Sequence, residues 1–140
     1  MKTLIALYGT GNTGKSVTLK KVYALLKAKY PNAPVRHEII DHDVRAIIDI
    51  KGLKLGIESQ GDPNSRLFES LPLFVREQCV IIICATRTRG GTVHAVEKLG
   101  SQFDIRWRSK LREPHTARHE QSNKAASLDI FKEIKTLISA

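Results

Sequence analysis

The residues best suited to chemistry lie near the start of the chain, in the segment Gly9-Thr10-Gly11-Asn12-Thr13-Gly14-Lys15-Ser16. Its glycines let the backbone turn tightly and approach a ligand closely, because no side chain stands in the way. Successive backbone N–H groups of such a loop can point at one anion. A helix that begins at the end of the loop adds about half a positive charge at its N-terminus. Lys15 adds a full charge, and Ser16 adds a hydroxyl that can ligate a divalent cation. The segment therefore predicts a phosphate-binding loop.

A strand before this loop and a helix after it are the elements that would position it. Residues 3–8 are a short apolar run, typical of a strand that is buried on both faces. Residues 15–29 follow the helical period, and Pro31 and Pro34 mark the end of the helix. The residues expected on its apolar face are Val17, Leu19, Val22, Leu25 and Leu26.

In this context the segment matches the pattern G-x-x-x-x-G-K-[ST] and resembles the Walker A motif of the P-loop NTPases. The resemblance is specific for residues 3–29 and rests on the order of strands and helices elsewhere. It implies ATP and Mg²⁺ as ligands, with Lys15 reaching the β- and γ-phosphates and Ser16 binding the metal. The cofactor-binding residues that it implies are Gly9, Thr10, Gly11, Asn12, Thr13, Gly14, Lys15, Ser16 and Val17.

A second region supplies acidic groups for such a metal. A strand over residues 53–57 would carry Glu58 and Asp62 to the edge of the sheet beside the phosphate loop. Either carboxylate could hold Mg²⁺ or a metal-bound water, or orient an attacking water; a plain solvated loop is the alternative. Gly56 interrupts the apolar run that usually precedes the acidic residue in this superfamily, so the choice between the two acids stays open. Residues 58–61 also resemble the D-x-x-G switch of GTPases, but no N-K-x-D motif supports guanine.

A third region is the loop of residues 86–92, which contains Arg87 and Arg89 and follows the most apolar run of the chain, residues 79–85. Two arginines at the carboxyl edge of a sheet can neutralise charge on a transferring phosphoryl group. They could equally hold an acidic substrate or a nucleic-acid phosphate, or belong to a basic surface loop.

Three further segments carry weaker signals. Residues 41–45, Asp-His-Asp-Val-Arg, are similar in character to the acceptor site of small P-loop kinases, or form a polar turn. His115 and His119 are spaced to share one face of a helix and could bind a transition metal. The stretch from Arg106 to Arg112 is basic, and its alternation predicts that Trp107 lies in the core rather than serving as a platform for base stacking.

Strands that alternate with helices predict a single α/β domain over residues 1–140, and the resemblance implies that it is a P-loop nucleotide-binding domain. We expect a three-layer sandwich with a mainly parallel central sheet and one antiparallel hairpin. That hairpin is expected at residues 51–52, between strands at 44–50 and 53–57. Further helices are expected over 66–77 and 92–99 and at the C-terminus, whereas 112–123 are expected to be polar and mobile. Ligands of such sheets bind beyond the carboxyl ends of the strands.

Composition sets outer limits on function. The 140 residues are 41% hydrophobic and 26% charged, which suits one globular domain. No apolar run approaches the roughly 20 residues that span a bilayer, so no membrane partner is expected. Cys79 and Cys84 flank one apolar run and leave no other cysteine for a disulfide framework, which favours a reducing, cytoplasmic setting.

The net charge of +9 is unevenly distributed, because residues 1–37 hold seven basic residues and no acidic one. Clustered positive charge attracts nucleotide phosphates, nucleic acid or an acidic partner. The leading hypothesis is a small P-loop protein that hydrolyses ATP with Mg²⁺, as an NTPase or a nucleotide-dependent switch. The second is a kinase that transfers the γ-phosphate, with Asp41 and Asp43 at its acceptor site and residues 109–123 as its lid. The third is a nucleic-acid-binding module that holds nucleotide as a structural ligand.

Overall fold

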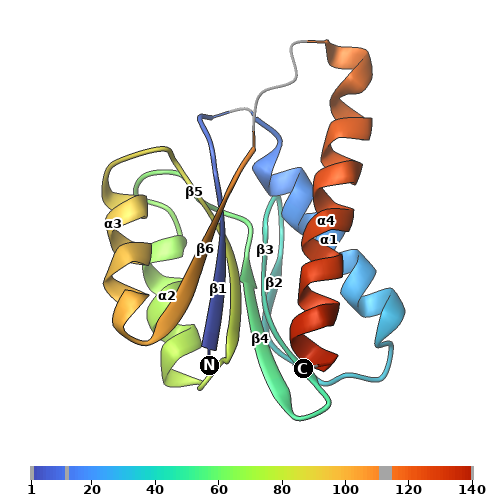
Figure 1. The fold of residues 1–140 in the computed structure, drawn as a ribbon, viewed down its shortest axis with the longest axis vertical. Helices are drawn as coiled ribbons and strands as arrows, with labels where there is room; N and C mark the ends of the chain where they lie inside the picture. The colour runs from blue at the N-terminus through green and yellow to red at the C-terminus, as the bar shows by residue number, and fades with distance from the viewer. Residues whose placement is uncertain (1, 12, 111–114, 140) are drawn as a thin grey trace.

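The computed structural model describes residues 2–11, 13–110 and 115–139, and within them it has an α/β fold with six strands and four α-helices (Figure 1). The strands are β1 (Lys2–Tyr8), β2 (Val35–Ile40), β3 (Val44–Ile50), β4 (Leu53–Glu58), β5 (Ile81–Thr86) and β6 (Phe103–Ser109). The α-helices are α1 (Lys15–Lys29), α2 (Leu67–Arg76), α3 (Gly91–Glu97) and α4 (His119–Ser139). Two short 3₁₀ helices, η1 (Lys98–Ser101) and η2 (Thr116–Arg118), complete the described elements.

The strands form one mixed sheet in the order β2-β3-β4-β5-β1-β6. The pairings β4–β5, β5–β1 and β1–β6 are parallel, whereas β3 runs antiparallel to both of its neighbours. The expected hairpin is confirmed: β3 and β4 pair around Lys51 and Gly52, and the φ of Gly52 is 84°. The pairing of β2 with β3 was not predicted, and it places the reversed strand between two strands that run with β1.

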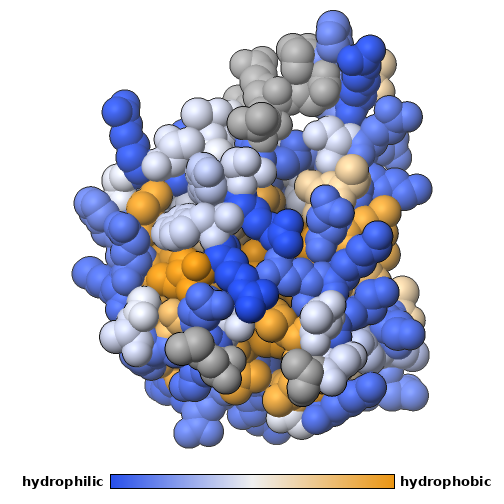
Figure 2. Space-filling model, viewed as in Figure 1, coloured by the Kyte–Doolittle hydropathy of each residue, from blue (hydrophilic) through white to orange (hydrophobic). Residues whose placement is uncertain are grey.

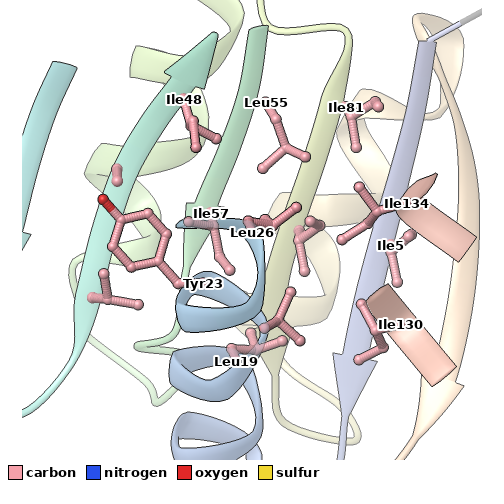
Figure 3. Close-up of a cluster of buried hydrophobic side chains, with 14 of the residues drawn as sticks. Ile5, Leu19, Tyr23, Leu26, Ile48, Leu55, Ile57, Ile81, Ile130 and Ile134 are labelled. Atoms are coloured by element: carbon pink, nitrogen blue, oxygen red, sulfur yellow. The ribbon is translucent and has the colours of Figure 1, made fainter. Parts of the chain in front are cut away.

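Helices cover both faces of the sheet. Helices α1 and α4 lie side by side on one face, and α2 and α3 lie on the other (Figure 1). On the α1–α4 face, Ile5 of β1 and Ile57 of β4 join Leu19 of α1 and Ile134 of α4 in one hydrophobic cluster (Figure 3). Leu4 and Ala6 of β1 point into a second cluster on the other face. Burial on both faces explains the continuous apolar runs of β1 and β5.

The helices agree with the sequence expectations in some places and differ in others. Helix α1 spans the predicted residues 15–29. Helix α4 begins at His119, so residues 119–123 of the segment expected to be polar and mobile are the start of a helix, while the expectation for 112–114 falls outside the described residues. Ser65 was expected to cap a helix over 66–77; its Oγ accepts a hydrogen bond from the N–H of Leu67, at which α2 begins.

Two apolar side chains are more exposed than their periodicity predicted. Val17 is 42% exposed, because it lies in the first turn of α1 at the end of the core. Trp107 is 39% exposed, because β6 is an edge strand and the ring rests edge-to-face against Tyr8 at a centroid distance of 6.0 Å. The expectation that Trp107 belongs to the core was therefore wrong.

The topology gathers several loops at one edge of the sheet. The carboxyl ends of β1, β4 and β5 meet there, and α1 begins at the same edge. Because β2 runs in the same direction as β1, the β2–β3 turn at residues 41–43 also reaches this edge. Within the described residues, no helix has the length and apolar character needed to cross a membrane.

Candidate phosphate and magnesium site

The loop between β1 and α1 ends in a conformation that glycine alone tolerates well. Gly14 precedes α1 with φ 88° and ψ 16°, in the left-handed region. A Cβ at this position would lie 2.3 Å from Oδ1 of Asn123, which projects from α4. The third glycine of the motif is therefore fixed both by backbone geometry and by the contact with α4. Asn12, one of the predicted ligands, lies outside the described residues.

Lys15 is the first residue of α1, and its side chain is buried against the loop. Its Nζ donates hydrogen bonds to the backbone oxygens of Gly9 and Thr10, the latter at 3.1 Å. Burial, together with the positive charge of Arg87, lowers the pKa of Lys15 to about 8 against the opposing effect of Asp62. A bound anion would stabilise the charged ammonium, so this lysine is poised to respond to phosphate.

Ser16 is hydrogen-bonded to a carboxylate that comes from a distant part of the chain. Its Oγ donates to Oδ1 of Asp43, which lies in the β2–β3 turn. Ser59 Oγ donates to the same oxygen at 2.8 Å, and Gln60 Nε2 lies 3.4 Å from Oδ2. Burial opposes ionisation of Asp43, but these hydrogen bonds outweigh it and hold its pKa below the usual value. An ionised carboxylate thus lies beside the hydroxyl that the motif reserves for a metal.

Asp43 was not predicted as the partner of Ser16. Sequence reasoning noticed Asp43 only as an acidic residue in a candidate acceptor segment. Its one available signal was its place directly after a strand. That signal could not reveal the contact, because the unexpected β2–β3 pairing decides where the turn lies.

Glu58 does not face the phosphate loop, contrary to the sequence expectation. Its side chain is fully buried on the α2 side of the sheet, where Ser70 Oγ donates to it at 2.6 Å. Arg66 Nε and Nη2 donate to its two oxygens at 2.7 and 3.0 Å. Two features of the sheet separate it from Ser16: β5 lies between β4 and β1, and strand alternation turns residue 58 away from the face of Ile57.

Asp62 and Arg87 meet directly above the phosphate loop. Arg87 Nε donates to Asp62 Oδ1 at 2.9 Å, which joins the loop after β4 to the loop after β5. The guanidinium lies 3.2 Å from the position that a Cβ on Gly11 would occupy. Asp62 therefore pairs with an arginine rather than with Ser16. Arg89 lies two residues farther along the same loop and is exposed.

These groups surround an open cleft of about 640 Å³. Lys15 and Ser16 form its floor, and the β2–β3 turn with Asp43 forms one wall. The first turns of α4, with His119 and Asn123, form another wall. Gln60 also lines the cleft; sequence reasoning missed it because a glutamine in a loop carries no distinctive pattern.

No transition-metal site follows from the two histidines. Helix α4 begins at His119 and His115 precedes it, so the two side chains do not share the helical turn that the prediction needed. In the described part of the chain, no three His, Cys, Asp or Glu side chains gather as metal ligands. Ser16 and Asp43 instead form a pair of oxygen donors, and a cation between them would take its other ligands from phosphate and water.

Comparison with known proteins adds no family to this picture. No family model matches the chain, and neither a curated protein nor a solved structure matches it. From its fold and its cleft, the chain is classed as an α/β protein with a mixed sheet and a polar cleft at the carboxyl edge of that sheet.

Proposed function

We propose that this chain is a small P-loop protein that binds a nucleoside triphosphate with Mg²⁺ and hydrolyses it, with ATP as the first nucleotide to test. One observation carries the proposal. The Ser16 hydroxyl, next to Lys15 at the start of α1, is hydrogen-bonded to Asp43 from 27 residues away. If the glycine-rich turn ended in Lys-Ser by chance, a contact between this serine and a carboxylate of the β2–β3 turn would not be expected.

Phosphate binding is supported by charge and by backbone geometry. The N-terminus of α1, which begins directly after the loop, has backbone N–H groups without partners inside the helix that can meet anionic oxygens. Lys15 adds its ammonium at the floor of the cleft, and Arg87 adds a guanidinium above Gly11. The β- and γ-phosphates would lie between these two cations.

Magnesium fits the donor set that lies next to the phosphates. Mg²⁺ prefers oxygen ligands and keeps several waters, so it needs few protein groups. The Ser16 hydroxyl would bind it directly, and the ionised Asp43 carboxylate would hold it directly or through water. The ion would neutralise charge on the β- and γ-phosphates. Asp43 thereby takes the role that the sequence left open between Glu58 and Asp62.

Two further groups suit the hydrolytic step. Gln60 lines the cleft, where its amide accepts from the N–H of Arg66 and donates to Asp43, and the second hydrogen on Nε2 can donate to an attacking water. Arg87 is paired with the largely exposed Asp62, and a γ-phosphate above Gly11 would compete with that carboxylate for its guanidinium. Arginine in this position would stabilise the charge that develops during phosphoryl transfer.

The kinase alternative finds less support. Asp43 accepts hydrogen bonds from Ser16 and Ser59, so it lies at the hydroxyl proposed to bind Mg²⁺ and serves the metal there rather than an acceptor hydroxyl. Asp41 accepts from the backbone N–H of Asp43 and pairs with Arg66. Part of the segment suggested as a lid, residues 119–123, is the beginning of the long helix α4.

The nucleic-acid alternative is also weakened. Arg106 and Arg108 both form ion pairs with Glu133, so much of the basic charge on β6 is already neutralised. Steep salt dependence would distinguish phosphate-backbone binding from closed binding of Mg-ATP.

The test is to incubate the protein with ATP and Mg²⁺ and to measure nucleotide affinity and free phosphate. We expect the wild-type chain to bind Mg-ATP and release phosphate. Lys15→Ala should abolish binding without changing the fold, and Asp43→Asn should reduce Mg²⁺-dependent turnover by about 10- to 100-fold. Asp129→Asn, an exposed carboxylate on α4, is the matched control. Wild-type affinity in Lys15→Ala would refute the site. In a parallel incubation with γ-phosphate-labelled ATP and a panel of metabolites, label transferred to a metabolite would identify a kinase.

A further inference from the structure

A second cavity lies between α2 and α3, on the face of the sheet opposite to α1 and α4. Its volume is about 700 Å³, and it shares no lining residue with the cleft around Lys15 and Ser16. It exists because α3 has only two turns and continues as the 3₁₀ helix η1, which leaves the outer side of α2 uncovered. We call it the α2–α3 pocket.

The α2–α3 pocket is lined mainly by apolar side chains. Phe68, Leu71 and Val75 contribute from α2, and Ala95 and Leu99 contribute from the opposite side. Phe68 is 43% exposed, although it belongs to a helix whose other face is buried. Figure 2 shows hydrophobic atoms open to solvent in the region of α2 and α3, with hydrophilic atoms around them. The volume falls within the range of small-molecule sites, about 300–1,000 Å³.

The charged groups at this pocket have one sign. Arg76 and Lys98 line it from opposite sides together with His94, and no carboxylate lines it. Across the described residues, neither Arg76 nor Lys98 takes part in an ion pair. An apolar hollow between two unpaired cations is complementary to a ligand with an apolar body and an anionic head.

We infer that the α2–α3 pocket binds a free amphipathic organic anion, such as a medium-chain carboxylate, with its hydrocarbon body against Phe68 and Ala95 and its head between Arg76 and Lys98. This inference does not depend on nucleotide hydrolysis, because the two cavities are separate.

Dodecanoate is the probe, and its affinity is measured by isothermal titration calorimetry, with 1-dodecanol as the uncharged probe of equal length. We expect one dodecanoate per chain and weaker binding of dodecanol. Lys98→Glu should weaken dodecanoate binding by about fivefold to tenfold, since it replaces attraction by repulsion at a partly desolvated head group. Lys132→Glu on α4 makes the same change of charge on the other face and should leave the affinity unchanged.

A second variant tests the apolar part of the site. Ala95→Glu places a carboxylate inside the pocket and should abolish dodecanoate binding, with folding followed by circular dichroism. Equal affinity in the wild type, Lys98→Glu and Ala95→Glu would overturn the inference, as would equal binding of dodecanol. A wild-type dimer that dissociates in Ala95→Glu, seen by sedimentation, would also overturn it, because the occupant would then be a second copy of the chain. Loss of ATP binding in Lys15→Ala, with dodecanoate binding retained, would separate the two sites.

Discussion

Lys15 carries a pKa lowered to about 8, chiefly because the side chain is buried. In the nucleotide-free protein this ammonium therefore begins to lose its proton as the pH rises through 8, well below the 10.5 expected in an unfolded chain. On the proposed function, triphosphate binding would favour the charged form and so require uptake of a proton above that pH. Lys15 would then make the affinity for nucleotide depend on pH in the mildly alkaline range.

We expect the affinity for Mg-ATP to be nearly constant below pH 7.5 and to fall above pH 8, by up to about tenfold per unit. The measurement is a binding titration between pH 6.5 and 9.5, together with calorimetry in buffers of different ionisation enthalpy to count protons. Lys15→Arg is the control, because arginine stays charged throughout this range. A profile that falls equally in both proteins would assign the pH dependence to another group.

Glu58 belongs to the fold rather than to the chemistry in this structure. Its carboxylate is fully buried with Arg66 and Ser70, so Glu58→Gln removes the charge that balances the guanidinium. We expect this variant to lower the free energy of unfolding by about 2 kcal/mol, the scale of a hydrogen bond to a charged group. ATP turnover per folded molecule should stay within twofold of wild type.

Urea denaturation measures the stability effect of Glu58→Gln. Glu69→Gln is the matched control, because Glu69 pairs with Arg45 through a side chain that is 76% exposed. Its cost should not exceed about 0.5 kcal/mol. Unchanged stability with lost turnover would return Glu58 to a catalytic role.

At the scale of elements, the phosphate loop depends on α4 as well as on β1 and α1. Gly14 meets Asn123 of α4, and its φ of 88° is costly for any other residue. Gly52, in the β3–β4 turn, has a similar φ of 84° but no atom within 4 Å of an added Cβ. Substitutions at these two glycines therefore distinguish the free-energy cost of the left-handed backbone from the cost of the contact with α4.

We expect Gly52→Ala to cost about 1 kcal/mol from the left-handed backbone alone. Gly14→Ala should cost about 1 kcal/mol more and weaken ATP binding, because the new methyl group would displace the buried amide of Asn123. Denaturation of the two variants in parallel gives the difference. Asn123→Ala, combined with Gly14→Ala, should recover part of the lost stability; no recovery would mean that the contact with α4 is unimportant.

Helix α4 also lines the cleft through His119, as the β2–β3 turn does through Asp43. We expect the nucleoside of a triphosphate bound at Lys15 to contact His119. His119→Ala should therefore weaken ATP binding by about fivefold, the scale of one net hydrogen bond, and leave inorganic tripolyphosphate unaffected. Calorimetry with both ligands tests this, and Glu120→Ala is the neighbouring control. Equal losses for both ligands would place His119 at the phosphates instead.

At the scale of the whole molecule, the two cavities lie at different places on the sheet. The cleft around Lys15 and Ser16 opens at the edge where β1, β4 and β5 end, and the α2–α3 pocket lies on the face opposite to α1. Ligand binding at either site should stabilise the native chain by linkage. Mg-ATP at 100 times its dissociation constant should add about 2.7 kcal/mol to the free energy of unfolding. Thermal unfolding with and without Mg-ATP measures this, and Lys15→Ala should show no shift.

Much of this arrangement follows from the sequence itself. Residues 3–8 and 15–29 were predicted as strand and helix because their patterns are local: a continuous apolar run, a 3.6-residue period, and glycines between them. The hairpin around Gly52 follows in the same way. Local signals likewise place Lys15 and Ser16 at the start of the helix, since both lie within one turn of the glycine that precedes it.

Tertiary structure alone decided which acid meets Ser16. Glu58 ends β4 and Asp62 follows it at the expected edge, but the order of strands inserts β5 between β4 and β1, and alternation turns Glu58 toward α2. The β2–β3 pairing brings Asp43 to the hydroxyl instead. Strand order and pairing depend on contacts between residues far apart in the chain, and a local pattern of residue types carries no record of them.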